Sequence, residues 1–218
     1  MRYDGLLLKA RSRSEDLGYY AHITKPSTFR WFHPSAGETV VDCGSSVGLF
    51  TMIALKNGAH VYAFEANPKT FEVLKENVAM NSFHKNAHIF NEGLSSESEE
   101  MTLYAPKHFT GTASFDIKWA ENMEDKDDIA RFRVPVTTLD ETMDGVEKID
   151  WLLIDVESFE YNLLLGSVKT LDRTRNIIIE ISHSQTEKVQ KLLQERGFSV
   201  SDRGEGEESV QYFLYTKV

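Results

Sequence analysis

The feature that most constrains the fold is a regular alternation of short apolar runs with helical patterns, which begins near residue 39. The apolar runs are rich in β-branched or aromatic residues, a composition typical of strands. Strands that alternate with helices predict βαβ units and a parallel sheet covered by helices. The expected strands are Thr39 to Asp42, His60 to Glu65, His88 to Asn91, Trp151 to Asp155 and Asn176 to Ile181.

Several signals mark the ends of the helices. Asn67 and Pro68 form a cap and a first-turn proline, and that helix is expected to end near Asn81. The stretch Ser184 to Glu187 reads as a capping box, and Gly197 is the expected end of the helix that follows. The closing segment, SVSDRGEGEESVQYFLYTKV, predicts two late strands joined by a turn.

Two regions interrupt this alternation. Residues 1–37 are expected to form a helical cap over the open end of the sheet. Residues 94–148 form an insert, which at the ligand-binding end of an α/β sheet is a candidate substrate lid. Its segments Met101 to Ala105, Thr112 to Phe115 and Arg131 to Val136 predict extra strands or a hairpin, and the acidic runs Ser95 to Glu100 and Glu121 to Asp128 predict solvated loops.

The bulk properties exclude several classes of protein. A chain of 218 residues suits a single domain over residues 1–218, with residues 183–218 as its closing helix and strand pair. A net charge of -10 disfavours nucleic acid as a partner. A single cysteine rules out a disulfide framework, and the early run Leu6 to Leu8 is too short for a signal peptide or a membrane span. We therefore expect a cytoplasmic protein without a membrane partner; the sequence does not indicate its oligomeric state.

The strongest chemical signal is the stretch VVDCGSSVGLFT, a strand followed by a glycine-rich turn and a helix start. Gly44 permits a tight turn, and Gly48 permits close approach of the helix to the strand or to a ligand. Ser45 and Ser46 interrupt the dinucleotide pattern, and Asp42 would repel a pyrophosphate. Asp42 beside an ammonium group, with turn amides on a carboxylate, suits a free amino-acid moiety. A role for Asp42 as an anchor of the turn stays open.

The second expected strand ends in Glu65, which should lie beside the glycine turn. An acid at that place can accept hydrogen bonds from both ribose hydroxyls. A plain helix-start acid is the alternative reading of Glu65. An amino acid at one end and a ribose at the other describe S-adenosylmethionine, which is therefore the expected cofactor.

Four segments together resemble the FkbM family of methyltransferases: VVDCGSSVGLFT, VYAFEANPKTFEVLKENVAMN, VTTLDE and IDWLLIDVESFEYNLLLG. The resemblance covers residues 38–182. It implies a Rossmann-like sheet of seven strands, mostly parallel with one antiparallel, and O-methylation of a hydroxyl on a small molecule or sugar. The cofactor-binding residues that it suggests are Asp42, Gly44, Ser45, Ser46, Gly48, Glu65, Ala66, Glu92, Gly93 and Asp155.

The resemblance also suggests residues for the chemistry. Asp155 and Glu157 match the family's signature acids, and Glu160 matches a later glutamate. Asp155 is expected next to the reacting end of the cofactor, where it orients the acceptor hydroxyl or accepts its proton. Glu157 is the second candidate for this catalytic role, and His183, just beyond the fifth expected strand, is an outside candidate for the base. Helix capping by the three acids is the structural alternative.

Ser158 departs from the family, which usually has glycine at this position. Its side chain is expected to narrow the pocket or to cap the next helix, and a backbone with unusual φ would make serine costlier than glycine.

No His/Cys cluster supports a transition-metal site, so no metal is expected, although strand-end acids are able to ligate Mg²⁺. Two further functions stay open. An RNA base methyltransferase is suggested by LKENVAMN but opposed by DVES at the strand end and by the acidic surface. A catalytically silent cofactor-binding module is the other, because a fold does not guarantee activity.

Overall fold

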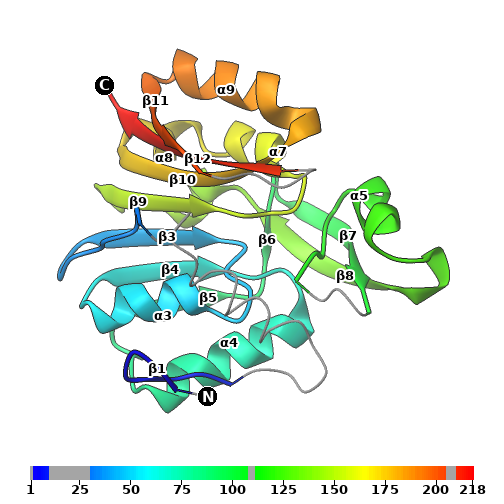
Figure 1. Cartoon of the computed structure of the whole chain (residues 1–218), viewed down its shortest axis with the longest axis horizontal. Helices are drawn as coiled ribbons and strands as arrows, with labels where there is room; N and C mark the ends of the chain where they lie inside the picture. The colour runs from blue at the N-terminus through cyan, green and yellow to red at the C-terminus, as the bar shows by residue number, and fades with distance from the viewer. Residues whose placement is uncertain (1, 10–29, 108–110, 205–209) are drawn as a thin grey trace.

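The computed structural model describes residues 2–9, 30–107, 111–204 and 210–218. Its centre is a seven-stranded sheet in the order β11-β12-β10-β9-β3-β4-β5 (Figure 1). The strands are β3 (Thr39–Cys43), β4 (His60–Phe64), β5 (Ala87–Phe90), β9 (Ile149–Ile154), β10 (Thr174–Ser182), β11 (Phe198–Arg203) and β12 (Val210–Lys217). All five core strands expected from the sequence are present, with small shifts at their ends.

The strand β12 runs antiparallel to both of its neighbours, β10 and β11, whereas the contacts among β10, β9, β3, β4 and β5 are all parallel. This arrangement confirms the expected Rossmann-like sheet with one antiparallel strand. It also confirms that the end of the chain forms two late strands. Parallel order brings the carboxyl ends of β3, β4 and β9 to one edge of the sheet, where ligands bind in folds of this kind.

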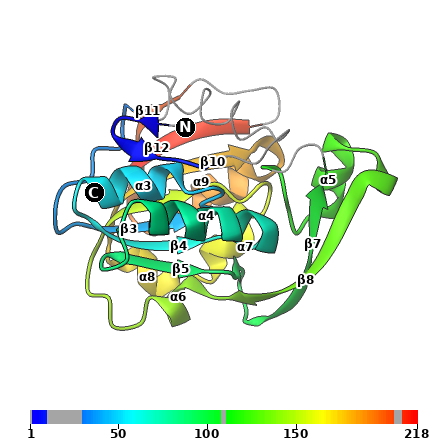
Figure 2. The same cartoon turned by 90° about the horizontal axis from the view of Figure 1, so that it is seen from below.

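Helices cover both faces of the sheet, because successive strand residues point to opposite faces. Val40 packs with the helices of one face and Val41 with those of the other. Figure 2 shows α3 and α4 on one side of the sheet and α6 and α8 on the other. The helices are α3 (Leu49–Lys56), α4 (Pro68–Met80), α5 (Ile117–Met123), α6 (Leu139–Thr142), α7 (Glu160–Leu165), α8 (Val168–Asp172) and α9 (Thr186–Glu195), with 3₁₀ turns η1 (Lys126–Asp128) and η2 (His183–Gln185).

The insert builds a second, three-stranded sheet from β6 (Gly93–Leu94), β8 (Ile129–Thr137) and β7 (Glu99–Pro106). Its long pair β7 and β8 is antiparallel and contains Met101 to Ala105 and Arg131 to Val136, so these two segments form extra strands, as expected. Both views show this sheet and α5 extending beyond one end of the main sheet (Figures 1 and 2). Thr112 to Phe115 contributes only an isolated bridge, between Ser114 and Tyr104. The expected loop over Glu121 to Asp128 is wrong, because α5 extends to Met123 and η1 follows it.

The first described residues pair as β1 (Arg2–Tyr3) and β2 (Leu6–Leu7), so residues 2–9 are not helical as the sequence suggested. The rest of the expected cap, residues 10–29, lies outside the described residues. Asn77 of α4 holds this first segment: its Oδ1 accepts from the Lys9 amide at 2.6 Å. Asn81 exchanges two hydrogen bonds with the backbone of Leu7.

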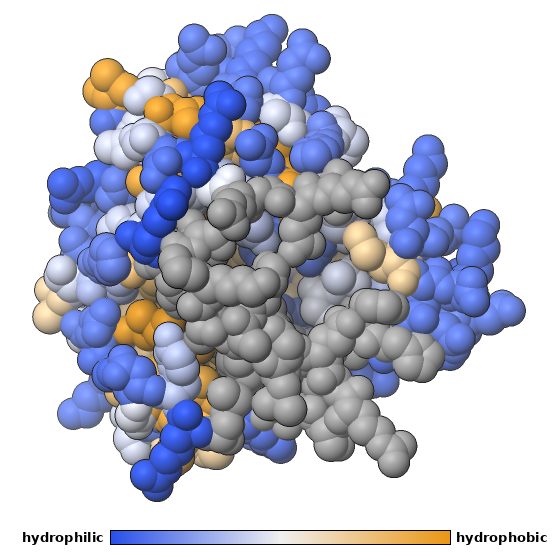
Figure 3. Space-filling model, in the orientation of Figure 1, coloured by the Kyte–Doolittle hydropathy of each residue, from blue (hydrophilic) through white to orange (hydrophobic). Residues whose placement is uncertain are grey.

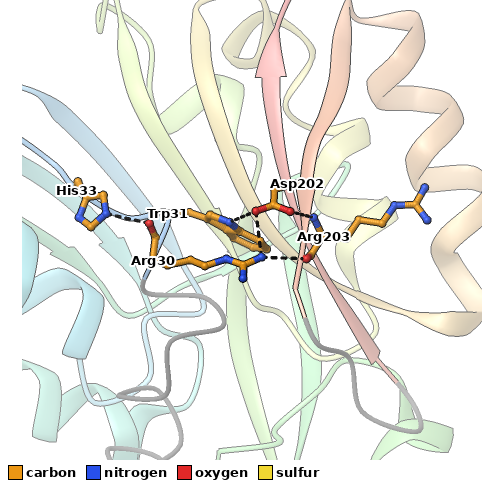
Figure 4. Close-up of polar contacts among 5 residues, drawn as sticks. All are labelled: Arg30, Trp31, His33, Asp202 and Arg203. Carbon is orange, nitrogen blue, oxygen red and sulfur yellow. Dashed lines mark hydrogen bonds and ion pairs between the residues drawn. The ribbon is translucent and has the colours of Figure 1, made fainter.

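A polar cluster ties the next described segment to the outer strand β11 (Figure 4). The Asp202 Oδ2 accepts from Trp31 Nε1 at 2.9 Å and from Arg30 Nη2 at 3.0 Å. The hydrogen bond from the Trp31 indole, more than any other contact, lowers the pKa of Asp202. The described surface in Figure 3 is largely hydrophilic, in keeping with the net charge of -10, and no helix among the described residues has the length and apolarity to cross a membrane.

The sequence signals predicted the start of α4 correctly, but for α9 they predicted only its end. Asn67 caps α4 as expected, because its side chain accepts from the Lys69 amide at 3.1 Å. The capping box at Ser184 does not form, since η2 occupies that stretch and no side chain caps α9. Gly197, which has φ +78°, follows the end of α9, as expected.

Candidate active site

The glycine-rich turn follows β3 and lies against the loop that follows β9. Gly44 has φ +82°, and a Cβ atom there would lie 1.8 Å from the carbonyl oxygen of Asp155. Gly48 has φ +91°, and its Cβ would lie 2.4 Å from Leu74 Cδ1 of α4. Gly44 therefore permits the close approach of two strand-end loops, and Gly48 that of two helices.

Asp42 supports the helix that follows the turn. Its Oδ2 accepts from Thr51 Oγ1 of α3 at 2.6 Å, and the residue is only 3% exposed. Burial raises the pKa of Asp42 to about 6, against the opposing effect of the Thr51 hydroxyl and amide. The structure thus favours the anchoring role of this carboxyl group, which the sequence had left open.

Glu65 lies beside the glycine turn, as its position at the end of β4 had suggested. Its Oε2 accepts from the Ser46 amide at 2.9 Å, and its Oε1 accepts from the Asn67 amide at 2.7 Å. Glu65 therefore joins the turn to the start of α4.

The other suggested cofactor residues lie on the same edge but differ in their contacts. The Ser45 amide and hydroxyl both bond to the Phe64 carbonyl, which fixes the turn to β4. Ala66 and Glu92 are partly exposed, after β4 and β5. Gly93 is buried in β6, where a Cβ would lie 2.4 Å from the ring of Phe115, so its position has a packing reason.

The acidic loop after β9 has an unusual backbone. Glu157 and Ser158 have φ +51° and +70°, a conformation that costs most residues free energy. The positive φ at Ser158 explains why glycine suits this position. Glu160 Oε1 accepts from the Ser158 amide at 2.8 Å, which holds the loop in this shape.

Ser158 does not cap the next helix, because α7 begins at Glu160 with Phe159 as its N-cap. Its Oγ and carbonyl oxygen instead accept from Gln185 Nε2. The capping alternative is therefore wrong for Ser158. Glu160 does occupy the first turn of α7, so it has the structural role that the sequence offered as an alternative.

Asp155 and Glu157 meet a third acid, Glu180 of β10. One carboxylate oxygen of each lies within 4.8 Å of those of the others. Burial, and then the charge of Asp42, raise the pKa of Asp155 to about 7. Burial also raises the pKa of Glu157 well above its ordinary value, with the charges of Glu180, Asp155 and Glu160 acting in the same direction. We call Asp155, Glu157 and Glu180 the acidic triad.

Neutral side chains of the late strands and the insert border the acidic triad. Tyr212 of β12 hydrogen-bonds Glu180, and burial together with the triad's charges raises the pKa of the tyrosine. The nearby indole N–H of Trp119 in α5 opposes the rise in the pKa of Glu157. Ser114 donates a hydrogen bond of 2.5 Å to the Glu157 carbonyl, and the rings of Phe115 and Phe159 lie 5.2 Å apart. The insert therefore contacts the acidic loop directly.

Sequence reasoning missed Glu180, Tyr212 and Trp119. A signal existed only for Glu180, a single acid inside the apolar run IIIEIS. His183 is exposed at the start of η2 and is not among the residues that form the triad. Its role as a base stays a prediction that the geometry does not favour.

Comparisons with known proteins agree with this architecture. The family model of the methyltransferase FkbM domain matches residues 42–200. Methyltransferase sdnD of Sordaria araneosa is 26% identical, over 93% of this chain and 90% of its own. Among solved structures, precorrin-6y C5,15-methyltransferase from Geobacter metallireducens GS-15 has a TM-score of 0.55 at 11% identity, over 100% of this chain and 97% of its own.

Magnesium protoporphyrin IX methyltransferase from Synechocystis PCC 6803, solved with bound SAM, has a TM-score of 0.51 at 13% identity, over 84% of this chain and 71% of its own. At such identities these two structures establish a shared fold. The FkbM match, in contrast, spans well over half of the sequence. The chain therefore belongs to the FkbM family of methyltransferases.

Proposed function

We propose that this protein uses S-adenosylmethionine to methylate a hydroxyl group of a small molecule or sugar. The observation that carries the proposal is the meeting of two loops at one edge of the sheet. One is the glycine turn with Glu65 beside it, and the other holds Asp155, whose amide donates to the Cys43 carbonyl at 3.0 Å. The proposed cofactor site would thus lie beside a carboxylate suited to a hydroxyl acceptor.

The residues present fit the cofactor. The amides of Ser46 and Asn67 hold Glu65 beside the glycine turn, at the strand end where an acid accepts hydrogen bonds from ribose hydroxyls. Asp42 fixes the turn through Thr51, and its charge favours a cationic group nearby. Ala66 and Glu92 would border the adenosine on the side of β4 and β5. When bound, S-adenosylmethionine supplies an activated methyl group.

Asp155 would orient the acceptor hydroxyl and take its proton. Its pKa of about 7 is close to the pH of a cell, where a general base is most effective. The Asp155 backbone is fixed against Gly44, so the carboxylate has a defined position relative to the turn. Such positioning supplies a large share of the rate in reactions of this type, because the reactants no longer lose translational freedom.

The acceptor would enter beside the insert. Ser114, Phe115 and Trp119 contact the acidic loop or its neighbours from that side. Aromatic rings bind the apolar faces of sugars and polycyclic compounds, and the triad's acids accept hydrogen bonds from hydroxyl groups. The insert thus has the composition of an acceptor-binding lid.

Calorimetric titration with S-adenosylmethionine tests the cofactor. We expect Glu65→Ala to weaken binding by roughly ten-fold or more, because both ribose hydrogen bonds are lost. The matched control Glu97→Ala removes the same charge from an exposed position and should bind as the wild type does. Folded wild-type protein that binds no S-adenosylmethionine would overturn the proposal.

Asp155→Asn tests the chemistry, once a methyl-labelled cofactor and a panel of hydroxylated sugars and metabolites have identified an acceptor. The variant should retain cofactor binding and lose roughly 10²- to 10⁴-fold in kcat, the usual contribution of a general base. Unchanged kcat would remove Asp155 from the chemistry. Transfer to an amino group of RNA by the wild-type protein would replace the proposed acceptor class.

A further inference from the structure

The acidic triad assembles because three adjacent strands place acids and a phenol at one level of the sheet. Parallel pairing of Ile154 with Ile179 puts the next residues, Asp155 and Glu180, side by side on the same face. Glu180 in turn pairs with Tyr212 of β12. Glu157 joins them from the loop, through its left-handed backbone. The grouping is thus built into the register of the sheet and does not depend on a surface side chain.

The charges around the triad are negative. Asp42 acts on Asp155, and Glu160 acts on Glu157, so the charges that act on these two carboxyl groups from the described residues are those of other acids. Carboxylates taken out of water are costly unless they are protonated, paired with a cation or bound to a metal. A cation at this place would remove the mutual repulsion of the three groups.

A separate observation lies at Glu160, which borders the triad. The residue is 1% exposed, and its Oε1 accepts from the Ser158 amide at 2.8 Å and from Ser182 Oγ at 3.4 Å. Its Oε2 is buried without a hydrogen-bond partner among the residues that the structure describes. The charge of Asp155 acts on Glu160, and that of Glu160 on Glu157, so the side chain is close to both. An unused buried acceptor beside three acids requires a donor, and the water of a hydrated cation is one.

We propose that Asp155, Glu157 and Glu180 bind a divalent cation, Mg²⁺, with Glu160 Oε2 accepting a hydrogen bond from one of its water ligands. Three carboxylate oxygens within 4.8 Å of one another are close enough to share one cation. Mg²⁺ keeps several of its six ligands as water and needs few carboxylates, whereas Ca²⁺ takes six to eight oxygen ligands and Zn²⁺ favours His or Cys ligands that the triad lacks. A divalent ion also matches the triad's charge better than an organic ammonium group.

The ion's role in catalysis rests on the proposed function, whereas its binding does not. A bound Mg²⁺ would hold the acceptor oxygen and lower the pKa of its hydroxyl. Asp155 would bind the ion through one carboxylate oxygen and take the acceptor's proton with the other. No metal was expected from the sequence, which has no His/Cys cluster, although strand-end acids able to ligate Mg²⁺ were noted there.

The test is titration of the full chain, without S-adenosylmethionine, using Mn²⁺ as a paramagnetic stand-in and Mg²⁺ as its competitor. The wild type should bind Mn²⁺ at one site, and Mg²⁺ should displace it. Glu180→Gln keeps the shape of the side chain and should weaken binding by roughly ten-fold or more. Glu157→Gln, in the partly exposed loop, should do the same and serves if the strand variant fails to fold.

The matched control is Glu97→Gln, an exposed acid of the insert, which should bind Mn²⁺ as the wild type does. Folded wild-type protein with no Mn²⁺ site, or equal binding by the wild type and both triad variants, would overturn the inference. S-adenosylmethionine binding that survives a chelator, without any Mn²⁺ site, would leave the proposed function standing and remove only the ion. A Mn²⁺ site in a protein that binds no S-adenosylmethionine would do the reverse.

Discussion

At the scale of single residues, glycine is required where two loops cross. The sequence predicted that Gly44 makes a tight turn, but not what lies against it. The structure places the Asp155 carbonyl oxygen there, 1.8 Å from where a Cβ atom on residue 44 would lie. The same contact holds the glycine turn and the acidic loop at a fixed position relative to each other.

The variants Gly44→Ala and Gly145→Ala distinguish the cost of a clash with Asp155 from the cost of a positive φ alone. Both residues have a positive φ, +82° and +81°, but a Cβ at Gly145 meets nothing within 4 Å. We expect Gly145→Ala to lower the free energy of unfolding by about 1 kcal/mol, and Gly44→Ala by about 4 kcal/mol or more, because only the second must displace backbone. Urea denaturation followed by circular dichroism measures both, and equal losses would contradict the explanation.

Ser158 and Glu180 show what could and could not be predicted for single residues from the sequence. A positive φ at Ser158 was foreseen as one option, since the family's glycine pointed to it. Glu180 was not foreseen, because a single acid in an apolar strand has no partner in the sequence that would disclose its role. Its meaning depends on Asp155, 25 positions earlier, and Tyr212, 32 positions later.

At the scale of elements, local signals predicted the strands and α4 well. The cap of α4 depends only on Asn67 and its near neighbours, so it could be read directly. The expected capping box at Ser184 failed because Gln185 makes contacts with the distant loop at Ser158 instead. The loop predicted for residues 121–128 was wrong because their acids are compatible with a short helix as well as with a loop.

The helix α4 also organises the start of the chain, through Asn77. This residue is 0% exposed; its Oδ1 accepts from the Lys9 amide at 2.6 Å, and its Nδ2 donates to the Val47 carbonyl at 2.8 Å. Asn77→Ala should lower the free energy of unfolding by about 2 kcal/mol, because buried backbone groups lose their partners.

The exposed Lys75→Ala on the same helix is the control for Asn77→Ala. It should change the free energy of unfolding by less than about 0.5 kcal/mol. Guanidinium denaturation of the two variants compares them directly. If they lose the same amount, the hydrogen bonds of Asn77 contribute nothing measurable.

At the scale of the whole molecule, several carboxyl groups with a raised pKa gather at the candidate active site. Burial raises the pKa of Asp42 to about 6, and that of Asp155 and Glu160 to about 7. A carboxyl group with a raised pKa binds its proton more tightly in the folded state than in the unfolded chain. The folded state therefore loses stability as the pH rises through this range.

For Asp42, the ordinary pKa of 3.8 and the folded value of about 6 set the window. Between pH of about 4 and 6, the free energy of unfolding should fall by about 3 kcal/mol on account of this group. Burial raises the pKa of Asp42 and the two hydrogen bonds from Thr51 oppose the rise, while Asp155, whose pKa is raised to about 7, extends the fall toward neutral pH. Asp42→Asn should flatten the profile relative to the wild type.

Urea midpoints measured from pH 4 to pH 8, without cofactor or divalent ions, test this expectation. A wild-type stability that rises across the lower half of that range, relative to Asp42→Asn, would contradict it. The acidic surface adds the same background to both proteins, so the difference between them isolates the buried carboxyl group.

By itself the sequence determined the order of the core strands, the glycine turn and the placement of Asp42 and Glu65 at the ends of neighbouring strands. These follow from local patterns, because periodicity, caps and glycines act over a few residues. Only the tertiary structure decided that Asp155, Glu157 and Glu180 form one group, bordered by Tyr212 and Trp119. That grouping depends on the register of β9, β10 and β12 and on where the insert lies, and the packing of the whole chain sets both.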